Sequence, residues 1–147
     1  MMATYFAGKE RRKFDQVNRM SIPPAFRDGL GQTVYILKSV QEDPCLLIYS
    51  EEEWGRFMDM VTDSFDSEEL IDAERTIADS SEMASVDKSG RITLKDDYKE
   101  YAQLNEDVLV IGANNRIELW LEENWNERCG KKADFKKISL TPRRNRG

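Results

Sequence analysis

The sequence predicts an α+β fold, mainly β, in which one structural unit occurs twice in tandem. Two loops of the same design, Asp15-Gln-Val-Asn-Arg19 and Asp87-Lys-Ser-Gly-Arg91, lie 72 positions apart in a chain of 147 residues. The apolar positions that follow the loops also match in pairs, Ile22 with Leu94, Phe26 with Tyr98, Tyr49 with Trp120, and Trp54 with Trp125. Runs that alternate apolar and polar residues after each loop indicate half-buried strands.

Each copy is expected to run strand, loop, strand, short helix, strand, strand. Strands are predicted at residues 4–14, 20–22, 34–37, 46–49, 92–94, 108–111 and 117–120. In the first copy Pro23-Pro24 precedes a short helix over 25–28, which Gly29 is expected to stop. In the second copy acidic residues at 96 and 97 favour the start of a helix before 98–101.

The two loops require the same backbone conformation. Asp15 and Asp87 open them, and an aspartate carboxylate can accept hydrogen bonds from backbone amides ahead of it. Asn18 and Gly90 stand at the equivalent later position, and both residue types adopt a positive φ at low cost. The arginine that follows each of them is therefore expected to project its donors from a fixed point.

The segment between the copies is predicted to form two acidic helices, one after Ser50 and one beginning near Ser67. Trp54 and Trp125 are interpreted as packing residues. Half-domains of about 70 residues would each bury too little surface alone, so residues 1–147 are expected to form one domain. Its predicted parts are a first repeat (5–54), a helical connector (55–80), a second repeat (81–128) and a basic, disordered tail (138–147).

The net charge is −6, and basic and acidic residues are concentrated in different segments of the chain. Residues 8–27 hold six basic side chains against two acidic ones, and residues 128–147 hold eight against one. Residues 51–87 hold thirteen acidic side chains against two basic ones. Basic segments of this kind favour contact with nucleic acid, but charged runs also occur as ordinary solvated faces, and both interpretations stay open at this point.

Composition weighs against an enzyme and against a cofactor. The chain has no histidine, which removes the usual acid and base near neutral pH. Cys45 and Cys129 are isolated, without metal-ligand spacing, and are expected to be reduced and structural. No catalytic residue, metal or cofactor is therefore predicted. The chain also lacks an apolar window of about 20 residues and a signal-peptide run, which predicts a soluble, cytoplasmic protein without membrane contact.

Several ordered motifs together resemble one family. They are Phe6-Ala-Gly8, the twin Asp-x-x-[Gly/Asn]-Arg loops, Arg19-Met-Ser-Ile-Pro23, Val110-Ile-Gly112 and Asn115-Arg-Ile-Glu-Leu-Trp120. Over about residues 5–128 the chain resembles the MraZ family, which belongs to the SpoVT-AbrB class of DNA-binding proteins. The resemblance implies a double-split, swapped-hairpin β-barrel of two interleaved repeats with peripheral helices.

The same resemblance implies a function and an assembly. It implies a transcriptional repressor that binds direct repeats of double-stranded DNA in the promoter of a division and cell-wall gene cluster, including its own promoter, and that is associated with the nucleoid. It also implies a ring-shaped homo-oligomer, of about eight or more subunits. The alternative from another class is a non-catalytic ring that acts as a protein-interaction scaffold.

The resemblance places the DNA contacts on the two loops. Arg19 and Arg91 are the leading candidates, supported by the basic residues Lys9, Arg11, Arg12, Lys13 and Lys88. Val17 and Ser89 stand where the family usually has lysine, and Lys95 stands where it has proline. The alternative is that each arginine only pairs with its own loop aspartate and fixes the turn. The first loop, in a basic setting, is expected to contact DNA, and the second to serve the fold as much as the DNA.

Overall fold

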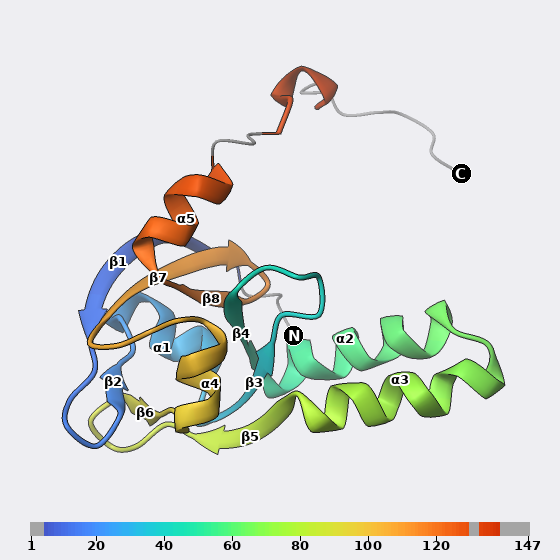
Figure 1. The fold of residues 1–147 in the computed structure, drawn as a ribbon, viewed down its shortest axis with the longest axis horizontal. Coiled ribbons are helices and arrows are strands. Elements are labelled where there is room, and N and C mark those ends of the chain that lie inside the picture. Colours follow the sequence, from blue (N-terminus) through green and yellow to red (C-terminus); the bar gives the residue numbers. More distant parts are fainter. Residues whose placement is uncertain (1–4, 130–132, 139–147) are drawn as a thin grey trace.

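The computed structural model describes residues 5–129 and 133–138. A six-stranded antiparallel sheet and a separate two-stranded ribbon form its centre, with helices around them (Figure 1). The strands are β1 (Phe6–Lys13), β2 (Arg19–Ser21), β3 (Thr33–Lys38), β4 (Cys45–Ser50), β5 (Ser81–Ser85), β6 (Arg91–Thr93), β7 (Asp107–Asn114) and β8 (Ile117–Trp120). The helices are α1 (Pro24–Leu30), α2 (Glu51–Ser64), α3 (Ser67–Asp79), α4 (Asp96–Tyr101) and α5 (Glu122–Cys129), followed by the 3₁₀ turn η1 (Phe135–Lys137). The predicted α+β class, mainly β, is confirmed.

The strand order shows that the two halves of the chain exchange strands. The large sheet has the order β1-β7-β8-β4-β3-β5, so β1 of the first half pairs with β7 of the second. In the same way β5 of the second half pairs with β3 of the first. Because each half supplies an edge strand to the other, neither half can complete its own part of the sheet.

The ribbon β2–β6 relates the two halves by an approximate two-fold axis. Met20 pairs with Ile92 at its centre, and each of these side chains is only 1% exposed. Beyond the ribbon, the amide of Ile22 donates to the carbonyl of Gly90 at 2.8 Å, and the amide of Leu94 donates to the carbonyl of Asn18 at 2.9 Å. The loop of each half is therefore held against the strand of the other half.

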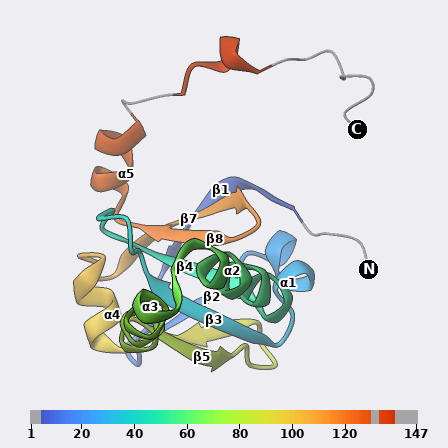
Figure 2. The ribbon, with the colours of Figure 1, turned by 90° about the vertical axis from the view of Figure 1, so that its right-hand side faces the viewer.

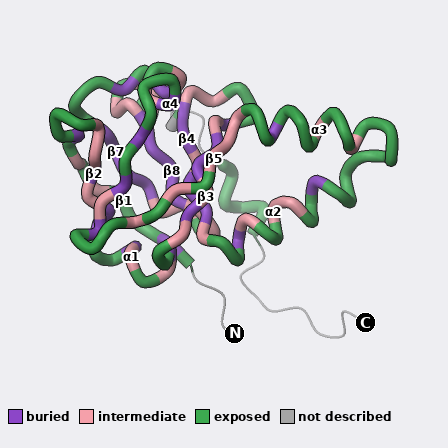
Figure 3. Tube along the Cα trace, turned by 90° about the horizontal axis from the view of Figure 1, so that it is seen from below, coloured by how far each residue is buried: buried purple, intermediate pink, exposed green. Residues whose placement is uncertain are grey.

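The largest apolar core is shared by both halves, because Met20 and Phe26 pack in one cluster with Ile92 and Val110. Figure 3 shows the buried residues concentrated on the strands, whereas α2 and α3 are largely exposed. Phe6 and Phe26 meet edge to face with ring centroids 5.8 Å apart. Cys45 is 1% exposed, and burial raises the pKa of its thiol to about 12, as expected for a reduced packing residue.

The acidic connector forms an antiparallel pair of helices that extends from the sheet (Figure 1) and is seen end-on in Figure 2. Ser50 and Asp66 cap α2 and α3 by accepting hydrogen bonds from backbone amides. Trp54 stacks on Tyr35 with ring centroids 5.0 Å apart. Trp125 meets Trp120 at 5.5 Å. Both tryptophans are thus packing residues, as predicted.

The expected end of the first short helix is wrong. Gly29 does not stop α1, which continues to Leu30. Leu30 is 2% exposed, so extending the helix brings this side chain into the core. The residue that ends the helix is Gly31, which has a φ of 75° and donates its amide to the carbonyl of Arg27 at 3.0 Å.

Most of the predicted basic tail, residues 139–147, lies outside the described residues. Within the described part, none of the helices has both the length and the apolar character needed to span a bilayer.

Gly112 is a position where the strand exchange depends on glycine. It pairs with Gly8, and a Cβ at Gly112 would lie 2.6 Å from the backbone nitrogen of Ala7. We expect Gly112→Ala to force β1 away from β7 and to lower the free energy of unfolding by about 1–3 kcal/mol. Urea unfolding followed by circular dichroism measures this change.

Gly55→Ala is the matched control for this substitution. Gly55 lies in α2, and a Cβ there would meet nothing within 4 Å. This variant should therefore gain up to about 1 kcal/mol from helix propensity. Equal effects of the two substitutions would contradict the tight β1–β7 approach.

Candidate nucleic-acid interface

The first loop is held by both oxygens of one carboxylate. Oδ1 of Asp15 accepts from the amides of Val17 and Arg19 at 3.0 and 2.9 Å, and Oδ2 accepts from Nε of Arg19 at 2.7 Å. The backbone closes the same loop, because the amide of Asn18 donates to the carbonyl of Asp15 at 3.1 Å. The side chain of the arginine and the course of the backbone are thus fixed by a single aspartate.

The second loop repeats this arrangement bond for bond. Oδ1 of Asp87 accepts from the amides of Ser89 and Arg91 at 2.8 and 2.9 Å, and Oδ2 accepts from Nε of Arg91 at 3.0 Å. The amide of Gly90 donates to the carbonyl of Asp87 at 2.9 Å. The predicted positive φ is found at both equivalent positions, 63° at Asn18 and 78° at Gly90.

We call each of these aspartate–arginine pairs a clasp, Asp15 with Arg19 and Asp87 with Arg91. The alternative interpretation, that each arginine pairs with its own loop aspartate, describes a contact that is present in both loops. In each clasp only Nε of the arginine side chain donates to the aspartate. Within the described part of the chain, the terminal nitrogens of the two arginines make no hydrogen bond. Each arginine is therefore anchored at one edge and keeps a fork of donors for another partner.

The loop environment keeps both aspartates charged. The pKa of Asp15 lies below its ordinary value, chiefly because the backbone amide of Arg19 donates to its carboxylate. The pKa of Asp87 is lowered in the same way, chiefly by the backbone amide of Arg91.

The two arginines lie on the same face of the ribbon. Arg19 is opposite Thr93, and Arg91 is opposite Ser21, whereas the alternate residues of both strands face the core. Residues directly opposite each other in a sheet share a face, and diagonal neighbours lie about 7–8 Å apart. The outer face of β2–β6 thus presents two anchored arginine forks side by side.

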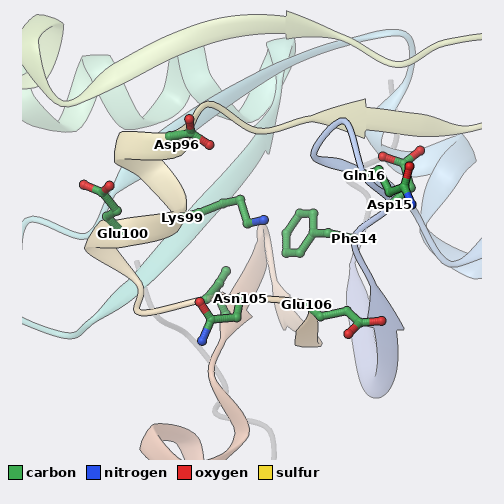
Figure 4. A pocket seen from close by; sticks show the side chains of 9 residues that line it. Phe14, Asp15, Gln16, Asp96, Lys99, Glu100, Asn105 and Glu106 are labelled. Carbon is green, nitrogen blue, oxygen red and sulfur yellow. The ribbon is translucent and has the colours of Figure 1, made fainter.

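Asn18 is braced from the second half of the chain. Its Nδ2 donates to Oδ1 of Asp96 at 2.8 Å, and its Oδ1 accepts from Nζ of Lys99 at 2.9 Å. Figure 4 shows Lys99 extending toward Phe14, and its Nζ lies 4.5 Å from the ring centroid. The asparagine therefore fixes the first loop through its side chain as well as through its φ.

Arg27 lies against the second loop, at the position equivalent to Lys99, but does not hydrogen-bond to that loop among the contacts of the described residues. A Cβ at Gly90 would lie 2.4 Å from Nε of Arg27, and that Nε donates to the carbonyl of Ile22 at 2.8 Å. The sequence repeat pairs Arg27 with Lys99, but sequence reasoning missed that each of them lies close to the loop of the other half. The sequence feature that could have indicated this contact is the basic residue at the equivalent position of both copies, Arg27 and Lys99.

The other predicted basic residues are dispersed. Both Nε and Nη2 of Arg11 donate to the carboxylate of Glu122, at 2.7 and 2.8 Å. Nζ of Lys13 contacts Asp107 at 2.6 Å. Arg12 is half-buried beside Glu10, whereas Lys9 and Lys88 are exposed and have no ion pair among the described residues.

An open hollow of about 760 Å³ lies beside the first loop (Figure 4). Asp15, Asp96, Glu100 and Glu106 line it, so this loop has acidic neighbours as well as the basic residues of β1. In the described residues, no three or more histidine, cysteine, aspartate or glutamate side chains are arranged to hold a metal ion. The acidic pair α2–α3 extends from the opposite side of the molecule to the ribbon β2–β6 (Figure 1).

Comparison with known proteins places the chain in a family. The family model described as "MraZ protein, putative antitoxin-like" matches residues 5–76 and 78–142. The chain belongs to the MraZ family. The resemblance predicted from the twin loops and their flanking motifs is thereby confirmed.

Similar proteins carry the name "Transcriptional regulator MraZ", which is not an enzyme class. One from Dictyoglomus turgidum is 32% identical over 123 residues, which are 83% of each chain. One from Acetivibrio thermocellus is 32% identical over 126 residues, covering 85% of this chain and 87% of that protein. One from Carboxydothermus hydrogenoformans is 29% identical over 136 residues, covering 91% and 94%.

The clasps should contribute to stability only while their aspartates are charged. Because the folded-state pKa of each lies below its ordinary value of 3.8, this stability is present above that value and is lost as pH falls through it toward the folded-state pKa. As the pH falls from about 5 to about 2, the free energy of unfolding of the Asp15→Asn/Asp87→Asn variant should therefore decrease less than that of the unmodified chain.

Urea unfolding at a series of pH values measures this slope. Asp59→Asn/Asp63→Asn, which removes two exposed carboxylates of α2, is the control for the change in net charge. Identical slopes for the unmodified chain and the loop variant would show that the loop carboxylates do not stabilise the fold.

Proposed function

We propose that this chain is a sequence-specific DNA-binding transcriptional regulator and not an enzyme. The observation that carries the proposal is the pair of clasped arginines on the outer face of the β2–β6 ribbon. The names of the similar proteins support it. A surface that fixes two partly exposed arginines, 38% and 33% exposed, through Nε alone is suited to an electron-rich partner such as a base edge or a phosphate.

The ribbon has a shape that fits double-stranded DNA. A major groove about 12 Å wide admits a two-stranded β-ribbon, and arginine pairs with O6 and N7 of guanine through two parallel hydrogen bonds. The clasps fix Arg19 and Arg91 before binding, which reduces the side-chain entropy lost in the complex. We therefore infer that β2–β6 enters the major groove and that these two arginines read bases.

Basic residues around the ribbon would contact phosphates. Lys88 lies in the second loop, and Lys9 lies on the exposed face of β1. Arg11 and Lys13 are paired with acids in exposed ion pairs, which contribute little to stability because solvent screens them, so exchanging these partners for phosphates costs little. Such contacts position a protein on DNA without reading its sequence.

We propose repression of a division and cell-wall gene cluster, including the chain's own promoter, through direct repeats, with the protein associated with the nucleoid. A homo-oligomeric ring, of about eight or more subunits, would present many ribbons on one face, so that weak contacts add through effective concentration. Monomers that each bind one repeat would lack this gain.

We also propose that the eight strands form the double-split barrel of the SpoVT-AbrB class. The exchange of β1 and β5 between the halves supports this assignment. The proposed units remain a first repeat (5–54), a connector (55–80) and a second repeat (81–128), although α2 crosses the first boundary.

The second candidate is a protein-interaction scaffold without DNA contact. The apolar, acid-lined groove between α2 and α3 favours it, because such a surface repels DNA and suits a basic protein segment. The two candidates differ in whether promoter DNA binds at all.

Removing either clasped arginine should weaken DNA binding. A bidentate base contact contributes about 1–3 kcal/mol, so Arg19→Ala and Arg91→Ala should each lower affinity about 10- to 100-fold. Gel shift with DNA from upstream of the chain's own gene measures the effect. Arg75→Ala is the control, because that side chain is 79% exposed on α3. Unchanged affinity in variants that assemble like the unmodified chain would refute the proposed contact.

Binding should also weaken steeply as salt increases. Each phosphate neutralised by a lysine or arginine releases counterions, so the logarithm of affinity should fall by about 0.9 per phosphate for each unit of log salt. Fluorescence anisotropy at several salt concentrations gives the slope. A flat response would favour the scaffold.

A further inference from the structure

The groove between α2 and α3 is an apolar surface that no described part of the same chain covers. It has a volume of about 620 Å³, comparable to pockets that bind small molecules. Phe57 and Val61 form its floor, and three of its other lining residues are large and exposed, Val40 at 50%, Met60 at 62% and Phe65 at 43%. Contiguous exposed apolar side chains of this kind mark interaction sites.

The rim of this groove is acidic. Glu69 and Asp72 line it from α3. The two helices α2 and α3 hold ten acidic residues against Arg56 and Arg75, and Asp66 between them adds an eleventh. An apolar groove with such a rim selects a segment that combines apolar side chains with positive charge.

The chain itself contains a segment of this composition. Phe135 and Ile138 are 76% and 53% exposed, although both side chains are large and apolar. The amide of Ile138 donates to the carbonyl of Phe135 at 3.0 Å, and this turn brings the two residues close together. Lys136 and Lys137 lie between them, so the turn offers two apolar anchors and two cations.

We propose that the groove between α2 and α3 of one copy binds the segment Phe135–Ile138 of a neighbouring copy of this chain. In Figures 1 and 2 this segment lies beyond α5 and away from α2 and α3, so it does not cover the groove of its own copy. Phe135 and Ile138 enter the apolar floor, and the two lysines pair with Glu69 and Asp72.

This contact joins different surfaces of the two copies. Head-to-tail contacts generate a closed ring when the rotation between neighbours closes, and otherwise an open filament. The inference rests on the homo-oligomer of the proposed function and names one contact that builds it. It is independent of the DNA-binding face, because the groove and the ribbon β2–β6 are on opposite sides of the molecule (Figure 1).

Cross-linking between full-length chains that each carry one introduced cysteine tests the contact. One chain carries Ser64→Cys at the edge of the groove, and the other carries Ala133→Cys next to the segment, both with Cys129→Ser. Neither substitution removes an apolar anchor or a charged partner. After mild oxidation of the mixture, we expect a cross-linked pair on a denaturing gel. The control chain replaces Ser64→Cys by Ala78→Cys, an exposed position of α3 outside the groove, and should give no cross-link.

Light scattering on the same mixture separates the possible failures. An intact oligomer without the cross-link overturns this contact and leaves the proposed ring in place. A monomer overturns both. In addition, a single chain that carries both Ser64→Cys and Ala133→Cys is oxidised alone. If it cross-links only within itself while the mixture of separate chains does not cross-link, the segment binds its own copy, which also overturns the proposal.

Charge exchange gives a second test. Lys136→Glu/Lys137→Glu should weaken self-association about tenfold, because two attractive pairs become repulsive. Adding Glu69→Lys/Asp72→Lys to the same chain should restore it, whereas adding Glu74→Lys, outside the groove, should not. If the first variant assembles like the unmodified chain, the lysines do not contribute to the contact.

Discussion

The pairing of β2 with β6 is the contact on which the rest of the structure depends. Its buried centre, Met20 opposite Ile92, joins the two halves of the chain at their point of symmetry. From there each loop is hydrogen-bonded to the other half, and β1 and β5 are exchanged across the large sheet. These contacts between the halves fix the two loops relative to each other.

In each loop the aspartate orients the arginine but does not occupy all of the arginine's hydrogen-bond donors. The aspartate accepts two backbone amides and Nε of its arginine, so the arginine is oriented while its terminal nitrogens stay available. Exposed ion pairs alone contribute little to stability, but here the carboxylate also closes the turn. The same bonds in both loops, at Asp15 and Asp87, show that pairing with the aspartate and projection toward a partner are compatible.

Features set by local chemistry were predictable from the sequence, and features set by distant contacts were not. The positive φ of Asn18 and Gly90 follows from the residue types that tolerate it, and strands β2 and β6 follow from the alternation of apolar and polar residues after each loop. The end of α1 was missed because burial of Leu30, a tertiary effect, extends the helix. The pairing of Arg11 with Glu122 joins residues 111 positions apart, which charge counting along the chain does not reveal.

The most direct test of the clasp is the affinity of Asp15→Asn/Asp87→Asn for promoter DNA. Asparagine keeps an oxygen that accepts the loop amides but loses the charged oxygen that holds Nε of the arginine. If the clasps orient Arg19 and Arg91 for DNA, this variant should bind more weakly than the unmodified chain, although two negative charges are gone. Tighter binding, the result that charge alone predicts, would contradict the account.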